Sequence, residues 1–164
     1  MKRCLLIINP SSGQRTIQNS LDKLTGQLIL QQLVNHIDVF YTQKKDDAYN
    51  HVLNVDEKNY DFIIVVGGDG TINEVVSGMV STNKKIPLCI LAAGTVNDFA
   101  NYLNLPNQVD KVCAMIKQFK TLCLDVGKIN DRYFMNVAAG ECLAMFLLPL
   151  AKQIKKIRSV SILH

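Results

Sequence analysis

Tryptophan is absent from the 164-residue chain, and its basic residues are not interleaved with aromatic ones. Surfaces that bind nucleic acid usually combine the two, so nucleic acid is not expected as a partner. The net charge of +4 is mild, and it is compatible with an anionic ligand or membrane surface without requiring either. A membrane span needs about 20 apolar residues. The longest apolar zone, 137–151, is shorter and contains Glu141 and Pro149, so a soluble protein is expected.

The five cysteines also lack a pattern: they are scattered, odd in number, and no pair has the spacing of zinc ligands. They are interpreted as reduced core residues of a cytoplasmic protein. The N-terminal apolar run stops at Asn9-Pro10, which is too short for a signal peptide and favours a first buried strand.

Strand and helix patterns alternate through residues 1–120, in a chain that is 48% hydrophobic and can therefore build a core. Strand-like runs cover 4–8, 37–42, 62–66 and 86–91, and helical spacing covers about 17–35, 46–53, 71–80, 96–103 and 108–119. This alternation predicts an α/β domain in three layers, αβα, with a mostly parallel sheet.

The alternation of strand and helix patterns ends near residue 121. Residues 121–129 and 132–138 are strand-like and are joined by a tight turn at Asn130-Asp131, which indicates an antiparallel hairpin. We interpret 121–164 as the incomplete start of a β-rich second domain. Residues 146–164 are expected to be helical, with basic residues on a solvated face or, alternatively, on anionic lipid.

The glycine turn, residues 67–71, is the most informative feature. Gly67-Gly68-Asp69-Gly70-Thr71 follows a buried strand and opens a helix. Converging backbone N–H groups and a helix N-terminus make a seat for a phosphate. A carboxylate at Asp69 is unfavourable there without a cation, so it suggests Mg²⁺ bridging to a nucleotide phosphate. The alternative is a plain turn between a strand and a helix.

Two familiar phosphate loops are excluded. The turn lacks the Gly-Lys-Ser/Thr ending of a P-loop, and Asn73 stands where the dinucleotide fingerprint needs a third glycine.

Two further loops follow predicted strands, where open parallel sheets bind ligands: 9–13 and 94–100. Asn9 and Ser11 could contact a nucleotide, or only form a turn. Thr95 could serve as a helix N-cap with Asp98 as its capping partner, and a capped helix start is also an anion site. After the glycine turn, Glu74 could complement the helix dipole, hold metal or order a neighbouring loop.

Together the three loops resemble the catalytic domain of the diacylglycerol kinase family, which includes soluble bacterial lipid kinases. The family has an Asn-Pro loop ending in Gly, then Gly-Gly-Asp-Gly-Thr-x-Asn-Glu, then Pro-x-Gly-Thr-x-Asn-Asp-Phe-Ala. This chain has Asn9–Gly13, Gly67–Glu74 and Ala92–Ala100. Leu124–Gly127 and Tyr133–Asn136 also resemble the start of the family's second domain. Ala92 departs from the usual proline, and Asn101 from a frequent basic residue.

The resemblance implies an NAD kinase/diacylglycerol kinase-like fold and an ATP-dependent lipid kinase acting on a diacylglycerol-like hydroxyl. The implied cofactors are ATP and Mg²⁺, and the lipid would be met at a membrane surface by a cytoplasmic or peripheral protein. Asp69 is the implied catalytic residue, and the implied metal ligands are Asp69, Asp98 and Asp125. The expected nucleotide-binding residues are Asn9, Ser11, Gly67, Gly68, Gly70, Thr71, Asn73, Glu74, Gly94, Thr95 and Asn97.

In this family a second β-rich domain is expected to supply the general base, so these 164 residues alone are expected to be inactive or nearly so. An incomplete second domain also leaves apolar surface, which favours a homodimer. The alternatives are a non-catalytic nucleotide-binding regulatory module and an NAD kinase-like enzyme.

Overall fold

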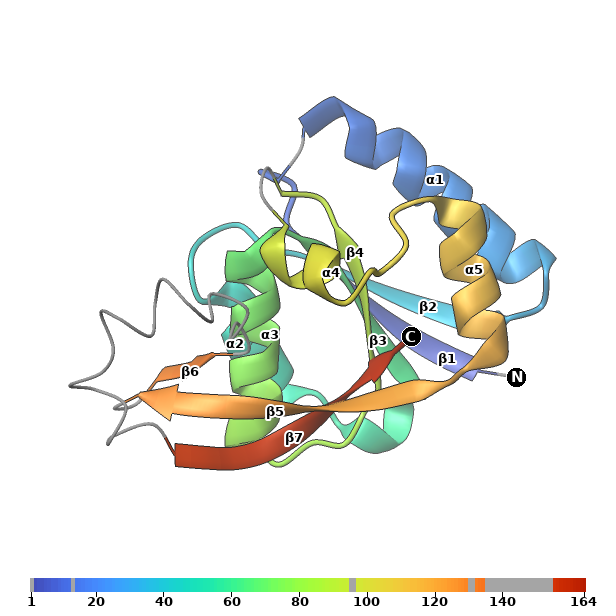
Figure 1. The fold of residues 1–164 in the computed structure, drawn as a ribbon. Helices are drawn as coiled ribbons and strands as arrows, with labels where there is room; N and C mark the ends of the chain where they lie inside the picture. The colour runs from blue at the N-terminus through green and yellow to red at the C-terminus, as the bar shows by residue number, and fades with distance from the viewer. Residues whose placement is uncertain (1, 13, 95–96, 130–131, 135–154) are drawn as a thin grey trace.

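A computed structural model describes residues 2–12, 14–94, 97–129, 132–134 and 155–164 (Figure 1). Its elements are β1 (Lys2–Ile8), α1 (Gln14–Leu30), β2 (Val34–Tyr41), α2 (Asp47–Asn54), the short 3₁₀ helix η1 (Glu57–Asn59), β3 (Phe62–Gly67), α3 (Asp69–Ser81), β4 (Leu88–Ala92), α4 (Asp98–Tyr102), α5 (Val109–Gln118), β5 (Thr121–Ile129), β6 (Arg132–Phe134) and β7 (Lys155–Leu163). Of the helices in these residues, none is both long and apolar enough to span a bilayer.

The strands form one sheet of seven in the order β2-β1-β3-β4-β7-β5-β6. From β2 through β1, β3 and β4 to β7, each adjacent pair of strands is parallel, whereas β5 pairs antiparallel with both β7 and β6. The prediction of a mostly parallel sheet is therefore confirmed.

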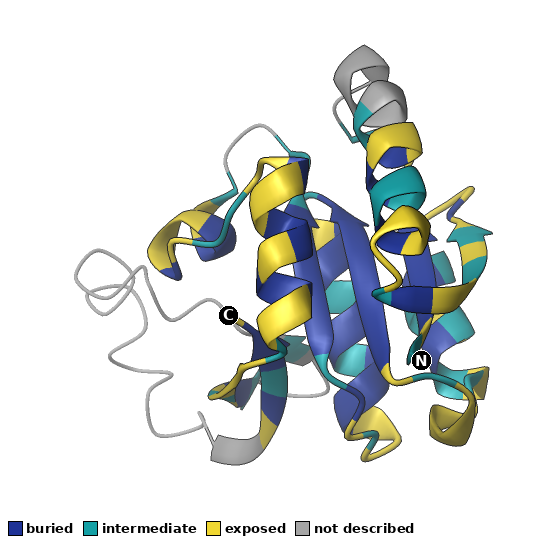
Figure 2. Ribbon diagram, turned by 90° about the vertical axis from the view of Figure 1, so that its right-hand side faces the viewer, coloured by how far each residue is buried: buried dark blue, intermediate teal, exposed yellow. Residues whose placement is uncertain are grey.

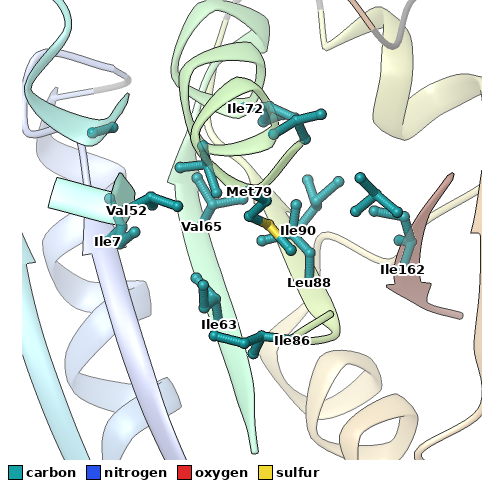
Figure 3. Close-up of a cluster of buried hydrophobic side chains, with 14 of the residues drawn as sticks. Ile7, Val52, Ile63, Val65, Ile72, Met79, Ile86, Leu88, Ile90 and Ile162 are labelled. Carbon is teal, nitrogen blue, oxygen red and sulfur yellow. The ribbon is translucent and has the colours of Figure 1, made fainter. Parts of the chain in front are cut away.

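Side chains along the buried strands point alternately to the two faces of the sheet, and each face has its own hydrophobic core. In β1, Leu5 and Ile7 face a cluster that includes residues of α2 and α3, as Figure 3 shows for Ile7 and Val52. Cys4, Leu6 and Ile8 face the opposite cluster, which includes residues of α1 and α5. Successive side chains of a strand point to opposite faces, so a wholly apolar strand covered by helices on both sides gives the predicted three layers (Figure 2).

α1 ends earlier than the apolar spacing predicts. The N–H of Leu33 donates to the carbonyl of Leu28 at 3.0 Å, and that of Gln32 donates to Ile29 at 2.9 Å, the bonding pattern of a Schellman motif. Gln32 has φ 56°, in the left-handed region. Glycine usually takes this position, so a glutamine there is not a recognisable helix stop signal, and β2 begins at Val34.

The predicted C-terminal helix is wrong for residues 155–163, which form β7. β7 pairs with β5 from Thr121↔Leu163 to Lys128↔Lys155 and meets β4 at Leu88↔Ile162. Long-range pairing thus overrides the local helical spacing. Residues 146–154 and the Asn130-Asp131 turn lie outside the described residues. The domain boundary near 121 stays a prediction, since β5 continues the same sheet.

The cysteine prediction holds for Cys4, Cys89 and Cys113, which are buried with free thiols. Burial raises the pKa of Cys4 to about 12, so its thiol stays protonated at neutral pH. Cys123 is exposed, so its predicted place in the core is wrong. Cys142 lies outside the described residues.

Candidate functional site

A cavity of about 400 Å³ opens at the carboxyl ends of β1, β2 and β3. Three connections line it: Asn9, Ser11 and Ser12 after β1, Thr42–Lys45 after β2, and Gly68, Gly70, Thr71 and Glu74 after β3. Ligands bind at such an edge in open parallel sheets. Two of the three predicted loops, those after β1 and β3, therefore line the same cavity. The loop after β2 also lines it, and this loop was not predicted from the sequence.

The glycine turn presents an open helix start to this cavity. Gly68 is the N-cap residue of α3, with extended backbone and no side-chain cap hydrogen bond. The first N–H groups of a helix have no partner within it, so they are available to an anion. Among the described residues, a Cβ added to Gly70 would meet nothing within 4 Å, whereas one added to Gly67 would lie 2.8 Å from Thr71 Cβ. Space is thus left at Gly70, on the cavity side.

Asn9 joins the first loop to the glycine turn. Its Nδ2 donates to Thr71 Oγ1 at 2.9 Å, and its Oδ1 accepts the N–H of Ser11 at 3.0 Å. Its own N–H donates to the carbonyl of Val66 at 2.9 Å. Asn9, Ser11 and Thr71 are therefore brought together, with the Asn9 amide engaged inside the protein, and their binding of a nucleotide stays a prediction.

The third loop packs behind the glycine turn. A Cβ on Gly94 would lie 2.8 Å from Gly68 Cα, so the two backbones are in contact. Asn97 Oδ1 accepts the Gly94 N–H at 2.8 Å, and its Nδ2 donates to the Gly94 carbonyl at 2.8 Å. Asn97 thus shapes this loop through both atoms of its amide. Thr95 lies outside the described residues.

The three predicted metal carboxylates are not gathered in one place. Asp69 Oδ1 accepts the Phe99 N–H of α4 at 3.4 Å, and the exposed Asp98 begins α4. Within the described residues, no group of three or more acidic, histidine or cysteine side chains could hold a metal ion.

Asp125 lies in a different part of the sheet. It belongs to β5, where it pairs with Ser159 of β7. It is not among the residues that line the cavity, so its predicted role as a metal ligand stays a prediction.

Glu74 lines the cavity, but its carboxylate is directed to the neighbouring helix. Oε1 accepts the N–H of Asp46 at 3.1 Å and Oε2 accepts that of Ala48 at 3.2 Å, at the start of α2. Of the alternatives that the sequence left open, the structure supports ordering of a neighbouring loop. Asn73 is half-buried in α3 and is not among the residues that line the cavity.

The lysine loop, residues 43–46, is the part of the site that the sequence analysis missed. Lys44 and Lys45 are exposed and line the cavity, so they supply positive charge near the glycine turn. Asp47 Oδ2 accepts the N–H groups of Gln43 at 2.8 Å and Lys44 at 2.9 Å. These backbone hydrogen bonds lower the pKa of the Asp47 carboxyl. The feature of the sequence that could have identified this loop is the pair of adjacent lysines after a predicted strand.

Comparison with known proteins finds relatives named diacylglycerol kinase. The chain is 34% identical over 156 residues to a diacylglycerol kinase of Staphylococcus saprophyticus, covering 95% of this chain and 50% of that protein. It is 35% identical over 139 residues to a diacylglycerol kinase of Staphylococcus carnosus, covering 85% and 45%. The chain thus spans about half the length of the curated relatives it matches.

Solved structures agree on the fold. A diacylglycerol kinase structure from Bacillus anthracis str. Sterne superposes with a TM-score of 0.72 at 26% identity, covering 91% of this chain and 54% of that one. Residues 3–129 match the family described as the diacylglycerol kinase catalytic domain. The chain belongs to the diacylglycerol kinase catalytic domain family.

Proposed function

We propose that this chain binds ATP with its phosphates in the cavity beside the glycine turn. In the whole protein it would be the nucleotide-binding part of a lipid kinase that transfers the γ-phosphoryl group to a diacylglycerol-like hydroxyl. Membership of the family and relatives named diacylglycerol kinase support the lipid acceptor. A lipid is met at a membrane surface, so a cytoplasmic protein acting peripherally at a membrane is part of the proposal.

The observation that carries the proposal is the open position at Gly70. Glycine costs about 0.5–1 kcal/mol relative to alanine inside a helix. Gly70 is the second residue of α3, and a methyl group there would meet no atom of the described residues within 4 Å. Packing among the described residues therefore gives no reason for a glycine. A phosphate approaching the first N–H groups of α3 does give one, because it needs that space.

The residues present also fit Mg²⁺. Mg²⁺ is usually held by one or two carboxylates together with substrate phosphates and water, so a cluster of three acids is not required. Asp69 lies in the glycine turn, and a carboxylate has two acceptor oxygens, of which Oδ1 makes a long contact to Phe99. Asp69 is accordingly proposed as the metal ligand and catalytic residue, with Asp98 in the adjoining helix as a second acidic group.

The chemistry that these residues supply is positioning and charge neutralisation. Phosphoryl transfer needs phosphates held in line and developing charge stabilised. The α3 N-terminus and the Gly68–Gly94 contact hold the phosphate seat, and Mg²⁺, when bound, neutralises charge on the phosphates. A general base for the lipid hydroxyl is proposed to lie in the part of the relatives that this chain does not span.

Calorimetry with Mg²⁺ and a non-hydrolysable ATP analogue tests the proposal. Gly70→Ala should weaken binding about tenfold or more, because its methyl group occupies the phosphate space. The same variant should raise the free energy of unfolding by about 0.5–1 kcal/mol. Gly26→Ala is the matched control, since Gly26 is also a helical glycine with open space around it, in α1. It should give the stability gain with unchanged binding.

An Asp69→Ala variant in the same experiment should also bind more weakly, most clearly with Mg²⁺ present. Unchanged binding by both Gly70→Ala and Asp69→Ala would remove the nucleotide from the glycine turn. In the complete protein, diacylglycerol compared with NAD as acceptor separates a lipid kinase from an NAD kinase-like enzyme. Binding without transfer to either would favour a regulatory module.

A further inference from the structure

The lysine loop is attached to α3 by a carboxylate that the reaction chemistry does not use. Both oxygens of Glu74 accept backbone N–H groups on either side of Asp47, at Asp46 and Ala48. Asp47 in turn accepts the N–H groups of Gln43 and Lys44. Three backbone donors of the lysine loop and one of the first turn of α2 therefore end on two carboxylates, which fixes the path of the loop.

The base of the loop is packed as well as hydrogen-bonded. Ala48 and Val52 of α2 are fully buried, and a Cβ on Gly78 of α3 would lie 2.9 Å from Val52 Cβ. α2 and α3 are thus in close contact. Asp46, at the junction, has φ 66° in the left-handed region, which is less favourable for aspartate than for glycine. Such a conformation persists where its surroundings hold it.

The direction of the Glu74 carboxylate also matters electrostatically. An unengaged carboxylate in the cavity wall would repel a phosphate. Here its charge is directed at two N–H groups at the positive end of α2, where a negative charge is favourable. The charged groups left at this side of the cavity include Lys44 and Lys45.

We propose that Glu74 is a positioning residue, which holds the lysine loop so that Lys44 and Lys45 bind the phosphate chain from the β2 side of the cavity. The glycine turn binds the same chain from the β3 side. This inference rests on the proposed nucleotide site, and it assigns the contribution of a loop that the glycine motif does not include.

The experiment compares Lys44→Ala/Lys45→Ala, Glu74→Gln and the triple variant by calorimetry with the Mg²⁺–ATP analogue at several salt concentrations. Loss of the two lysines should weaken binding about tenfold or more and flatten its salt dependence. Glu74→Gln places an NH₂ donor against a backbone N–H, so it should weaken binding in the same way. When Glu74→Gln is added to the lysine variant, binding should weaken little further, because the effects of substitutions at coupled residues are not additive.

Glu57→Gln is the matched control. Glu57 Oε2 accepts the N–H of Lys85 at 3.0 Å, a glutamate-to-backbone contact between elements away from the cavity. It should leave both binding and salt dependence unchanged. Amide exchange at Asp46 and Ala48, measured without nucleotide, should be faster in Glu74→Gln alone.

The outcomes separate the two proposals. If the wild type binds the analogue and Glu74→Gln leaves affinity and salt dependence unchanged, the positioning role is overturned and the nucleotide site stands. If the wild type does not bind, both are overturned. Should Glu74→Gln fail to fold, Asp47→Asn replaces it, since it releases the Gln43 and Lys44 amides from an exposed carboxylate, and the same non-additivity with the lysine variant is expected.

Discussion

The two sides of the cavity are held by different physics. On the glycine side, Gly68 and Gly94 touch through their backbones, so the geometry depends on side chains being absent. On the lysine side, Glu74 and Asp47 hold the loop by accepting backbone N–H groups, so the geometry depends on charges being present. The first should be sensitive to added volume, and the second to loss of charge or to protonation.

Gly94→Ala should break the glycine side and have the largest effect. Its Cβ would lie 2.8 Å from Gly68 Cα and 2.9 Å from Asn97 Oδ1, so backbone has to move. We expect a loss of about 1–3 kcal/mol in the free energy of unfolding, measured with denaturant, and weaker nucleotide binding.

Gly68→Ala is the graded control for that change. Its Cβ would meet Gly94 Cα at 3.4 Å, an ordinary contact, so the loss of stability should be clearly smaller. Equal effects of the two variants would mean that the contact between the loops does not set the geometry of this side.

The glycine side is also the side of the cavity that could be predicted from the sequence. Glycines and Asp69 between an apolar strand and an amphipathic helix predict a phosphate seat from local order alone, and the strand and helix were confirmed. The lysine loop has no such signature. Lys44 and Lys45 reach the cavity because β2 lies beside β1, and sheet order is a long-range property that local pattern does not state.

Other features that local pattern did not predict have the same origin. Residues 155–163 have helical spacing of basic residues, yet they pair with β5 and β4. The strand containing Asp125 was predicted, but its pairing with β7 was not, because that pairing depends on the order of the strands in the sheet. Asn97 was predicted to bind the nucleotide because of its loop, whereas its amide bonds to Gly94 became visible only in three dimensions.

Acid should loosen the lysine side before the Gly68–Gly94 contact, which contains no titratable atom. Hydrogen bonds from Gln43 and Lys44 lower the pKa of Asp47 from 3.8. A lowered folded-state pKa gives stabilisation that is present above the unfolded value and lost as pH falls through the folded one. We expect the Asp47 carboxyl carbon and the Gln43 and Lys44 amides to titrate together by NMR, with a midpoint below 3.8.

Asp110 provides the comparison for this titration. Its lowered pKa comes from Lys23 and Gln27 side chains. Lys23→Ala should therefore raise the pKa of Asp110 and leave that of Asp47 unchanged. Asp47→Asn should remove the acid transition of the two amides, and its persistence would show that another group holds the loop.

The smallest expected effect concerns Asp46, which has φ 66° at the junction between the lysine loop and α2. Alanine tolerates the left-handed region poorly and glycine tolerates it well, so Asp46→Ala should be less stable than Asp46→Gly by about 1 kcal/mol, measured by denaturant unfolding. If Glu74 enforces that conformation, the difference should shrink in a Glu74→Gln background, because the released loop can relax to negative φ. A difference that stays constant would place the origin of the strain in the α2–α3 packing, which Glu74→Gln leaves intact.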